Sequence, residues 1–168
     1  MNYTIVIDYQ KDFIDGALYN EEAIKIRPNV IKRIKEGIGC KNKLVFTRDT
    51  HNEDYLSTNE GNNLPVIHCI KGSTGHELDK EMMSSFNYPH DIIDKPTFGY
   101  KDWNLDNPEN IYMLGVCTDI CVISNALILK AKYPEANIYV YRDAVAGLSI
   151  EKNNAALNVL ESCQVKVI

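Results

Sequence analysis

The chain has 168 residues, 45% of them hydrophobic, and a formal net charge of −5. This length and composition suit a single domain with a substantial core and exclude a disordered chain. The net acidic charge disfavours nucleic acid as a partner, because neutralising phosphates requires clustered Lys and Arg. No apolar run approaches the roughly 20 residues of a membrane span, so no membrane partner is expected either.

The first ten residues, MNYTIVIDYQ, have no basic region and no long apolar segment. They do not resemble a signal peptide, and a cytoplasmic location is expected.

The five cysteines are odd in number and irregular in spacing, which does not favour a disulfide framework. Cys117 and Cys121 have no second cysteine pair to complete a zinc site. One of these two could be a nucleophile, or both could be packed core residues.

Compact apolar runs predict six strands, at residues 4–8, 43–49, 91–95, 110–117, 137–143 and 164–168. Helical patterns lie between them, from Pro28 to Gly39 and at 77–86, 119–132 and 151–162, with Thr118 and Ser149 as expected N-caps of the last two. The alternation predicts one α/β domain over residues 1–168, with a mainly parallel six-stranded sheet, helices on both faces and hence three Rossmann-like layers. The long polar stretch 50–76 is expected to carry function.

In an open parallel sheet, ligands bind beyond the carboxyl ends of the strands. Asp8 ends the first predicted strand and Lys95 ends the third. Asp49 ends the second strand, and His51 follows just after it. The fourth strand leads into Cys121. Cys121 is expected in the first turn of a helix, where free backbone N–H groups and the helix dipole favour a thiolate. Alone, each of these residues also has a structural explanation. Their convergence on one rim predicts an active site.

Three motifs, VIDYQKDF, KPTFGY and GVCTDICV, in that order, resemble the nicotinamidase and isochorismatase-like cysteine hydrolases. The segments FTRDTH and LPVIHCIKGSTG also fit, and the resemblance covers essentially the whole chain. It implies a catalytic triad of Asp8 as general base, Lys95 as charge-holding residue and Cys121 as nucleophile, with a thioester intermediate. It also implies an oxyanion hole from the backbone N–H groups of Cys117 and Cys121, and a cis peptide between Val116 and Cys117.

The same resemblance implies a divalent metal ion beside the triad, zinc in the first place and manganese or iron as alternatives. Asp49, His51 and His68 match the ligand pattern of the family, and Glu60 is the remaining candidate, because no histidine lies between residues 52 and 67. The alternative is that the two histidines only hydrogen-bond loop backbone. His76 and His90 match no motif and are expected on the surface.

The resemblance implies a small-molecule amide substrate, with nicotinamide as the leading candidate, and a homo-oligomer. Nicotinamidases commonly place an aromatic residue before the later histidine, but this chain has NNLPVIHC there. Phe13, which could also be a core residue, and Tyr55 are therefore the candidate substrate-binding residues. A ureido or carbamoyl amide is an alternative substrate, and Cys121 argues against a true isochorismatase, which generally lacks the cysteine.

Two further hypotheses about function come from other classes of protein. A non-catalytic binding module on the same fold stays open as an alternative. A dinucleotide-binding oxidoreductase is excluded, because no G-x-G-x-x-G follows the first strand.

Overall fold

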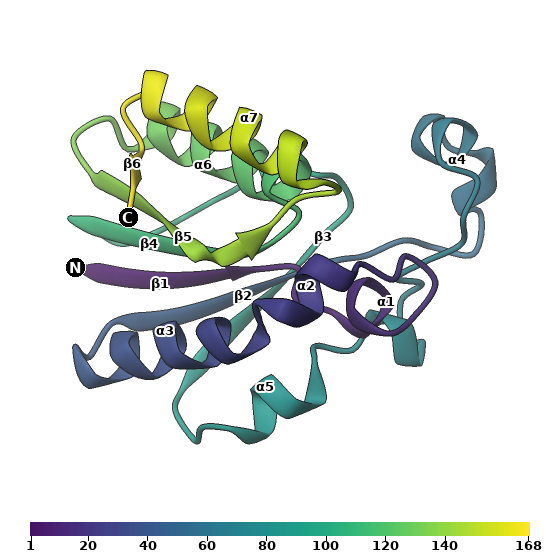
Figure 1. Cartoon of the computed structure of the whole chain (residues 1–168), viewed down its shortest axis with the longest axis horizontal. Helices are drawn as coiled ribbons and strands as arrows, with labels where there is room; N and C mark the ends of the chain where they lie inside the picture. The colour runs from purple at the N-terminus through teal and green to yellow at the C-terminus, as the bar shows by residue number, and fades with distance from the viewer.

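The computed structural model describes residues 1–168 and is built on one six-stranded parallel sheet (Figure 1). The strand order is β3-β2-β1-β4-β5-β6, and every neighbouring pair is parallel. The strands are β1 (Asn2–Ile7), β2 (Lys43–Asp49), β3 (His90–Lys95), β4 (Asn110–Val116), β5 (Asn137–Ala146) and β6 (Lys166–Val167). The predicted six-stranded parallel sheet is confirmed.

Helices cover both faces of this sheet (Figure 1). One face carries α3 (Arg27–Gly39) and α5 (Lys80–Ser84), and the other carries α6 (Ile123–Lys132) and α7 (Ile150–Ser162). The short helices α1 (Lys11–Ile14) and α2 (Glu21–Lys25) follow β1. A projecting segment carries the 3-10 turn η1 (Tyr55–Ser57) and α4 (Asn59–Asn63), and the 3-10 turn η2 (Thr74–His76) follows it. No helix is both long and apolar enough to span a membrane.

The central strand β1 is buried on both sides. Ile5 and Ile7 belong to the core beneath α6 and α7, while Val6 belongs to the second core beneath α3. Alternating side chains point to opposite faces of a strand, so an apolar residue at each of these positions places β1 inside a three-layer structure. This arrangement fixes the carboxyl end of β1 at the centre of the molecule, next to those of β2 and β4.

Local capping signals are partly confirmed. Pro28 lies in the first turn of α3, and the Ser149 hydroxyl accepts a hydrogen bond from the Lys152 N–H at 3.1 Å, which caps α7. The prediction that Thr118 is the N-cap of this helix was wrong, because Thr118–Val122 already form a π-helical turn, η3, ahead of α6. Its hydroxyl instead donates to Asn153 Oδ1 at 2.6 Å and ties η3 to α7.

The structure differs from the sequence-based expectation mainly in short elements. Helices α1, α2 and α4 were not predicted, because a helix of four or five residues is too short to show a repeating apolar face. The helix expected at 77–86 is confined to Lys80–Ser84, and the last strand to Lys166–Val167. Strand β5 is longer than predicted and shifts its register against β4 between Met113 and Gly115.

Candidate active site and metal centre

Asp8, Lys95 and Cys121 lie close together beyond the carboxyl ends of the strands, and all three are buried. Asp8 directly follows β1, Lys95 is the last residue of β3, and Cys121 lies in η3 after β4. Asp8 has a φ of 46°, a left-handed conformation that few non-glycine residues adopt and that is concentrated at functional sites.

The Lys95 ammonium lies between the other two side chains. Its Nζ is 2.6 Å from Asp8 Oδ2 and 3.5 Å from Cys121 Sγ, and it donates to the Thr97 carbonyl at 3.0 Å. Burial by itself would lower the pKa of Lys95, but the negative charges of Asp8, Cys121 and Asp49 outweigh it and raise the pKa above its ordinary value. Lys95 is therefore a charged ammonium at neutral pH.

Asp8 is a stronger base than an exposed aspartate. Burial raises its pKa, and the opposing effects of Lys95 and of the Thr47 hydroxyl, which donates to Asp8 Oδ1 at 2.6 Å, do not cancel this. Such a carboxylate is suited to accept a proton from a neighbouring group.

Cys121 is a thiol in the resting protein. Burial raises its pKa well above the ordinary value, the Asp8 charge raises it further, and Lys95 only partly offsets both. The expectation that the start of a helix would favour a thiolate here was wrong, because desolvation dominates. A nucleophilic thiolate would have to form by proton transfer within the site.

Cys117 lies one turn before Cys121. The peptide bond between Val116 and Cys117 is cis, as the family resemblance implied, and the carbonyl of Cys117 accepts hydrogen bonds from the N–H groups of Ile120 and Val122. Both cysteines line the same pocket, and all five cysteines of the chain are free thiols.

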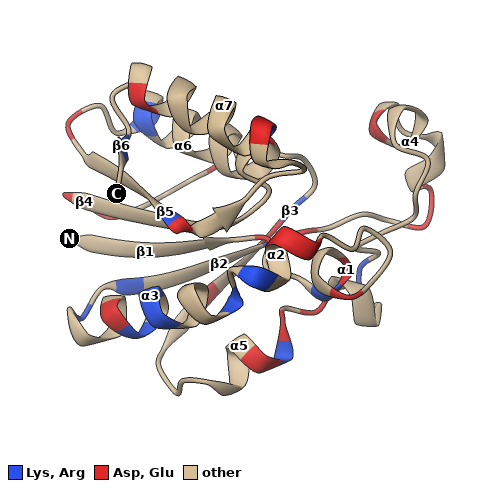
Figure 2. Ribbon diagram, in the orientation of Figure 1, with Lys and Arg blue, Asp and Glu red and all other residues tan.

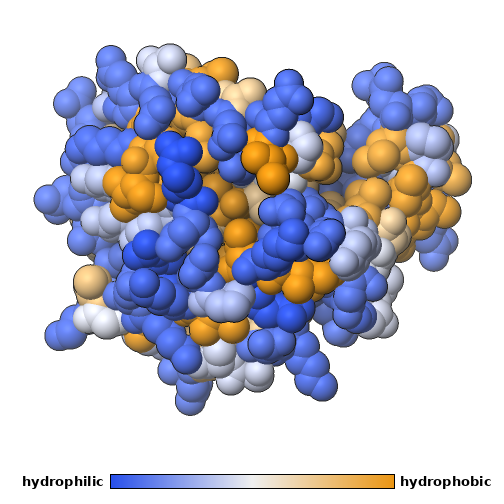
Figure 3. All heavy atoms as spheres, in the orientation of Figure 1, coloured by the Kyte–Doolittle hydropathy of each residue, from blue (hydrophilic) through white to orange (hydrophobic).

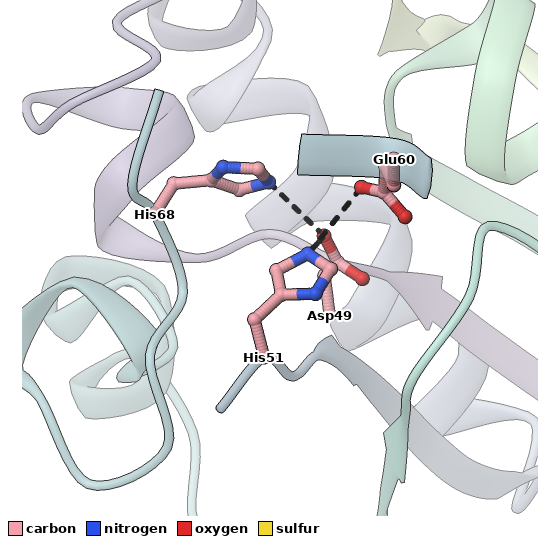
Figure 4. A group of neighbouring side chains, drawn as sticks. All are labelled: Asp49, His51, Glu60 and His68. Atoms are coloured by element: carbon pink, nitrogen blue, oxygen red, sulfur yellow. Dashed lines mark hydrogen bonds and ion pairs between the residues drawn. The ribbon is translucent and has the colours of Figure 1, made fainter. Parts of the chain in front are cut away.

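Asp49, His51, Glu60 and His68 form a second cluster beside these residues (Figure 4). One donor atom from each lies within 4.8 Å of all the others. His51 Nε2 is 3.0 Å from Asp49 Oδ2 and 3.4 Å from Glu60 Oε1, and His68 Nε2 is 3.5 Å from Asp49 Oδ2. Two carboxylates and two imidazoles at this spacing are a donor set suited to zinc, manganese or iron.

The charges of this cluster also suit a cation. Burial alone would raise the pKa of Asp49, but hydrogen bonds from His51 and His68 and the charge of Lys95 hold it well below its usual range. Glu60, in contrast, has a raised pKa, because it is partly buried next to Asp49. Glu60 Oε1 is buried without a hydrogen-bond partner, and Asp49 Oδ2 is the oxygen that faces both histidines. A bound cation would satisfy the Glu60 oxygen.

His68 hydrogen-bonds the backbone of its own loop, and its ring also faces Asp49 in the cluster. Its Nδ1 lies 2.7 Å from the Val66 carbonyl, which can only accept, so this nitrogen carries the proton. Nε2 faces Asp49 and can bind a metal ion once it has given up its own proton, which is the usual arrangement of a histidine ligand. The two expectations for His68 are therefore compatible with each other.

A cavity of about 700 Å³ opens above Cys121. The residues that line this cavity include Phe13, Asp49, Glu60 and His68, so the cavity joins the two clusters.

Tyr55, predicted to contact substrate, does not line the cavity. Its side chain is buried, its ring packs against those of His51 and His68, and its hydroxyl donates to the Leu64 carbonyl at 3.0 Å. Tyr55 thus packs against the two histidines without reaching the cavity.

His76 was predicted on the surface, and this was wrong. It is buried beneath the loop after β2, with Nε2 2.8 Å from Thr50 Oγ1. His76 ends a three-residue 3-10 turn, which is too short to give a periodic pattern from which burial could be inferred. His90 is exposed, as predicted.

Two buried amide side chains that support the site were not predicted. The Gln10 side chain donates to the Asp49 carbonyl at 2.9 Å and accepts from the Asp49 N–H at 2.7 Å, which fixes the end of β2. Asn125 donates to the Cys121 carbonyl at 2.8 Å and accepts from the Trp103 indole at 3.0 Å. The available signal for Asn125 was a polar amide, next to Ser124, within the otherwise apolar stretch ICVISNALIL.

The fold and the location of these residues define a class: an α/β protein with a parallel sheet and a buried polar site at the carboxyl ends of its strands. The sequence profile of the isochorismatase domain matches residues 3–168. The chain therefore belongs to the isochorismatase family.

Among its relatives is a nicotinamidase of Schizosaccharomyces pombe. It is 24% identical over an alignment 204 residues long, gaps included, which covers 98% of this chain and 91% of the relative. The solved pyrazinamidase/nicotinamidase of Streptococcus mutans is 27% identical, with a TM-score of 0.87 and 100% of both chains covered. The pyrazinamidase of Pyrococcus horikoshii in complex with zinc is 29% identical, with a TM-score of 0.83 and 99% and 98% of the two chains covered. The chain is thus a nicotinamidase/pyrazinamidase-like member of its family.

Proposed function

We propose that residues 1–168 form one cysteine hydrolase domain that cleaves a small-molecule amide, with nicotinamide as the leading substrate. The observation that carries this proposal is the buried contact of Lys95 with both Asp8 and Cys121 at the base of a pocket. Buried charges with displaced pKa values that adjoin a pocket are typical of active sites. Relatives described as nicotinamidases and pyrazinamidases give further support.

In the first half of the reaction, Asp8 accepts the thiol proton of Cys121, and the sulfur attacks the amide carbonyl carbon. The Lys95 ammonium stabilises the thiolate as it forms. The backbone N–H groups of Cys117 and Cys121 donate to the carbonyl oxygen as it gains negative charge. Asp8 then returns the proton to the leaving nitrogen, the C–N bond breaks, and ammonia leaves behind a thioester.

In the second half, a water molecule attacks the thioester carbonyl carbon, and Asp8 accepts a proton from that water. The C–S bond breaks, the sulfur of Cys121 is protonated again, and the carboxylic acid is released. The sum is one amide and one water converted into one acid and one ammonia, with no redox change. The raised pKa of Asp8 suits it to act as base in both halves.

Asp49, His51, Glu60 and His68 would hold a divalent metal ion, with zinc as the leading candidate and manganese or iron as alternatives. The buried Glu60 oxygen that lacks a hydrogen-bond partner supports this, and so does the zinc complex of the Pyrococcus horikoshii relative. When bound, such an ion supplies a Lewis acid that can orient a polar group of the substrate. Phe13, which lines the cavity and meets the His68 ring edge-on, would form one wall for a planar ring.

A second candidate substrate is a ureido or carbamoyl amide. Leu64 lines the cavity, but no aromatic residue precedes His68 in the segment NNLPVIHC. One of the two ring-stacking walls expected for a pyridine is therefore missing.

The test is ammonia release from nicotinamide by the purified protein, before and after chelation and with zinc or manganese added back. Cys121→Ala should abolish the release, and Cys163→Ala, which changes an exposed thiol, should not. No release from nicotinamide but release from a carbamoyl amide would select the second candidate. No release from either would favour a binding module.

A further inference from the structure

The cavity above Cys121 is larger than a single-ring amide needs. Its volume of about 700 Å³ lies within the range of about 300–1,000 Å³ that is typical of pockets for drug-sized ligands. Cys117, Cys121 and His68 lie at its inner end, where the proposed chemistry occurs. Its lining continues outward to α2 and to the start of α7.

Hydrophobic side chains surround the opening of this cavity. Five large hydrophobic residues that are between 37% and 68% exposed line it, and we call them the outer rim: Tyr19, Leu64, Phe98, Leu148 and Ile150. Figure 3 shows hydrophobic atoms gathered on the projecting segment that carries α4, to which one of these residues belongs. Scattered exposed hydrophobic residues are ordinary, but a group around one opening marks a binding surface.

The same opening carries negative charge. Glu21 and Glu22 of α2 line the cavity, and no Lys or Arg does (Figure 2 shows the acidic start of α2). Lys25 pairs with both glutamates at 3.1 and 2.8 Å, which leaves two carboxylates against one ammonium. Lys95 is wholly buried and already bound to Asp8. A carboxylate on a ligand would therefore meet no free cation here.

Taking the proposed amidase function as given, we infer that the substrate is an uncharged amide with an apolar substituent that extends from the ring to the outer rim. An apolar group in this position buries its surface against the outer rim. Each fully buried CH₂ group contributes about 0.8 kcal/mol of binding free energy, which corresponds to a roughly fourfold higher affinity. A carboxylate in the same position loses its hydration without gaining a partner and lies near Glu21 and Glu22.

The experiment compares nicotinamide with two series of derivatives, substituted at each ring carbon by a butyl group or by a carboxypropyl group of similar length. The two chains begin identically at the ring, so the reacting amide is electronically similar in both. For at least one ring position we expect kcat/KM to rise about tenfold with butyl, because part of the chain is buried. With carboxypropyl at that position, kcat/KM should fall below the value for nicotinamide.

Protein variants locate the effect. Leu148→Ser combined with Ile150→Ser should reduce the butyl-to-nicotinamide ratio of kcat/KM about fivefold. Val159→Ser is the control, because Val159 is exposed on α7, the helix that begins at Ile150, but does not line the cavity. Glu21→Gln combined with Glu22→Gln should raise kcat/KM for the carboxypropyl derivative about threefold, as expected for charges near the surface.

Equal kcat/KM for the butyl and carboxypropyl derivatives at every ring position would overturn the inference. So would an unchanged butyl-to-nicotinamide ratio in the outer-rim variant. In both cases ammonia release from nicotinamide would leave the proposed function standing. Absence of ammonia from nicotinamide and from every derivative would overturn the proposed function itself, so the two failures are distinguishable.

Discussion

Lys95 Nζ lies 2.6 Å from Asp8 Oδ2, and neither side chain is accessible to solvent. A buried pair of this kind gains Coulomb energy but loses the hydration of both charges, so it is not a device for stability. In this site the pair has a chemical consequence. It places a permanent positive charge beside the thiol of Cys121 and a carboxylate with a raised pKa next to it.

Removing one partner of the pair should destabilise the protein strongly. Lys95→Met leaves Asp8 buried without its counter-charge, and we expect a loss of about 3–5 kcal/mol in the free energy of unfolding, measured with urea. Adding Asp8→Asn to this variant should recover part of the loss, because the uncompensated charge is gone. Lys101→Met, at an exposed position, is the control and should change little. A double variant no more stable than Lys95→Met would contradict this account.

The Thr47 hydroxyl should set the acid limb of the pH–rate profile. It donates to Asp8 Oδ1 at 2.6 Å and thereby opposes the rise in the pKa of Asp8. Thr47→Val removes this hydrogen bond, so the pKa of Asp8 should rise and the acid limb of kcat/KM should move to higher pH. Thr4→Val changes a buried threonine of β1 and should leave the limb in place. A shift to lower pH in Thr47→Val would show that Asp8 is not the group that titrates.

The sheet and the position of the site could be predicted from the sequence because each depends on a local pattern. The apolar runs of β1 and β4 mark buried strands, Asp8 directly follows β1, and Lys95 ends β3. The protonation state of Cys121 could not be predicted, since it depends on how deeply neighbouring elements bury the thiol. Asn125 was missed for a related reason, as its partners lie in other segments of the chain.

Glu60 should contribute to metal binding through the oxygen that lacks a hydrogen-bond partner. Glu60→Gln keeps the shape of the side chain but removes the charge, so we expect zinc affinity to fall at least about tenfold in isothermal titration calorimetry. Glu53→Gln alters an exposed glutamate of the same segment and provides the control. If both variants bound zinc as the unmodified protein does, Glu60 would not be a ligand.

Asn125 should be essential to the stability of the site. Its amide donates to the Phe98 and Cys121 carbonyls, at 3.0 and 2.8 Å, and accepts from the Tyr100 N–H and the Trp103 indole, at 2.9 and 3.0 Å. Asn125→Leu would leave these groups without a partner, and a loss of about 3 kcal/mol or more in unfolding free energy is expected.

Urea denaturation can measure this loss, with Asn158→Leu on the exposed face of α7 as the control. That exchange has no buried partner to lose and should change stability by less than about 0.5 kcal/mol. Similar stabilities for the two leucine variants would mean that the hydrogen bonds of Asn125 are replaced by others.

His76 should make the protein less stable as the pH falls. Burial lowers its pKa below the ordinary value, and the charge of Arg48 lowers it further. The unfolded chain therefore takes up a proton at a higher pH than the folded chain does, so stability is lost as the pH drops from the unfolded pKa of about 6.5 through the folded pKa. His76→Gln removes this titration, and its melting temperature should fall less between about pH 7.5 and pH 5.5 than that of the unmodified protein. His68, whose pKa is raised, contributes in the opposite direction but is the same in both proteins. A His76→Gln protein that kept the full pH dependence would show that His76 is protonated equally in the folded and unfolded chains.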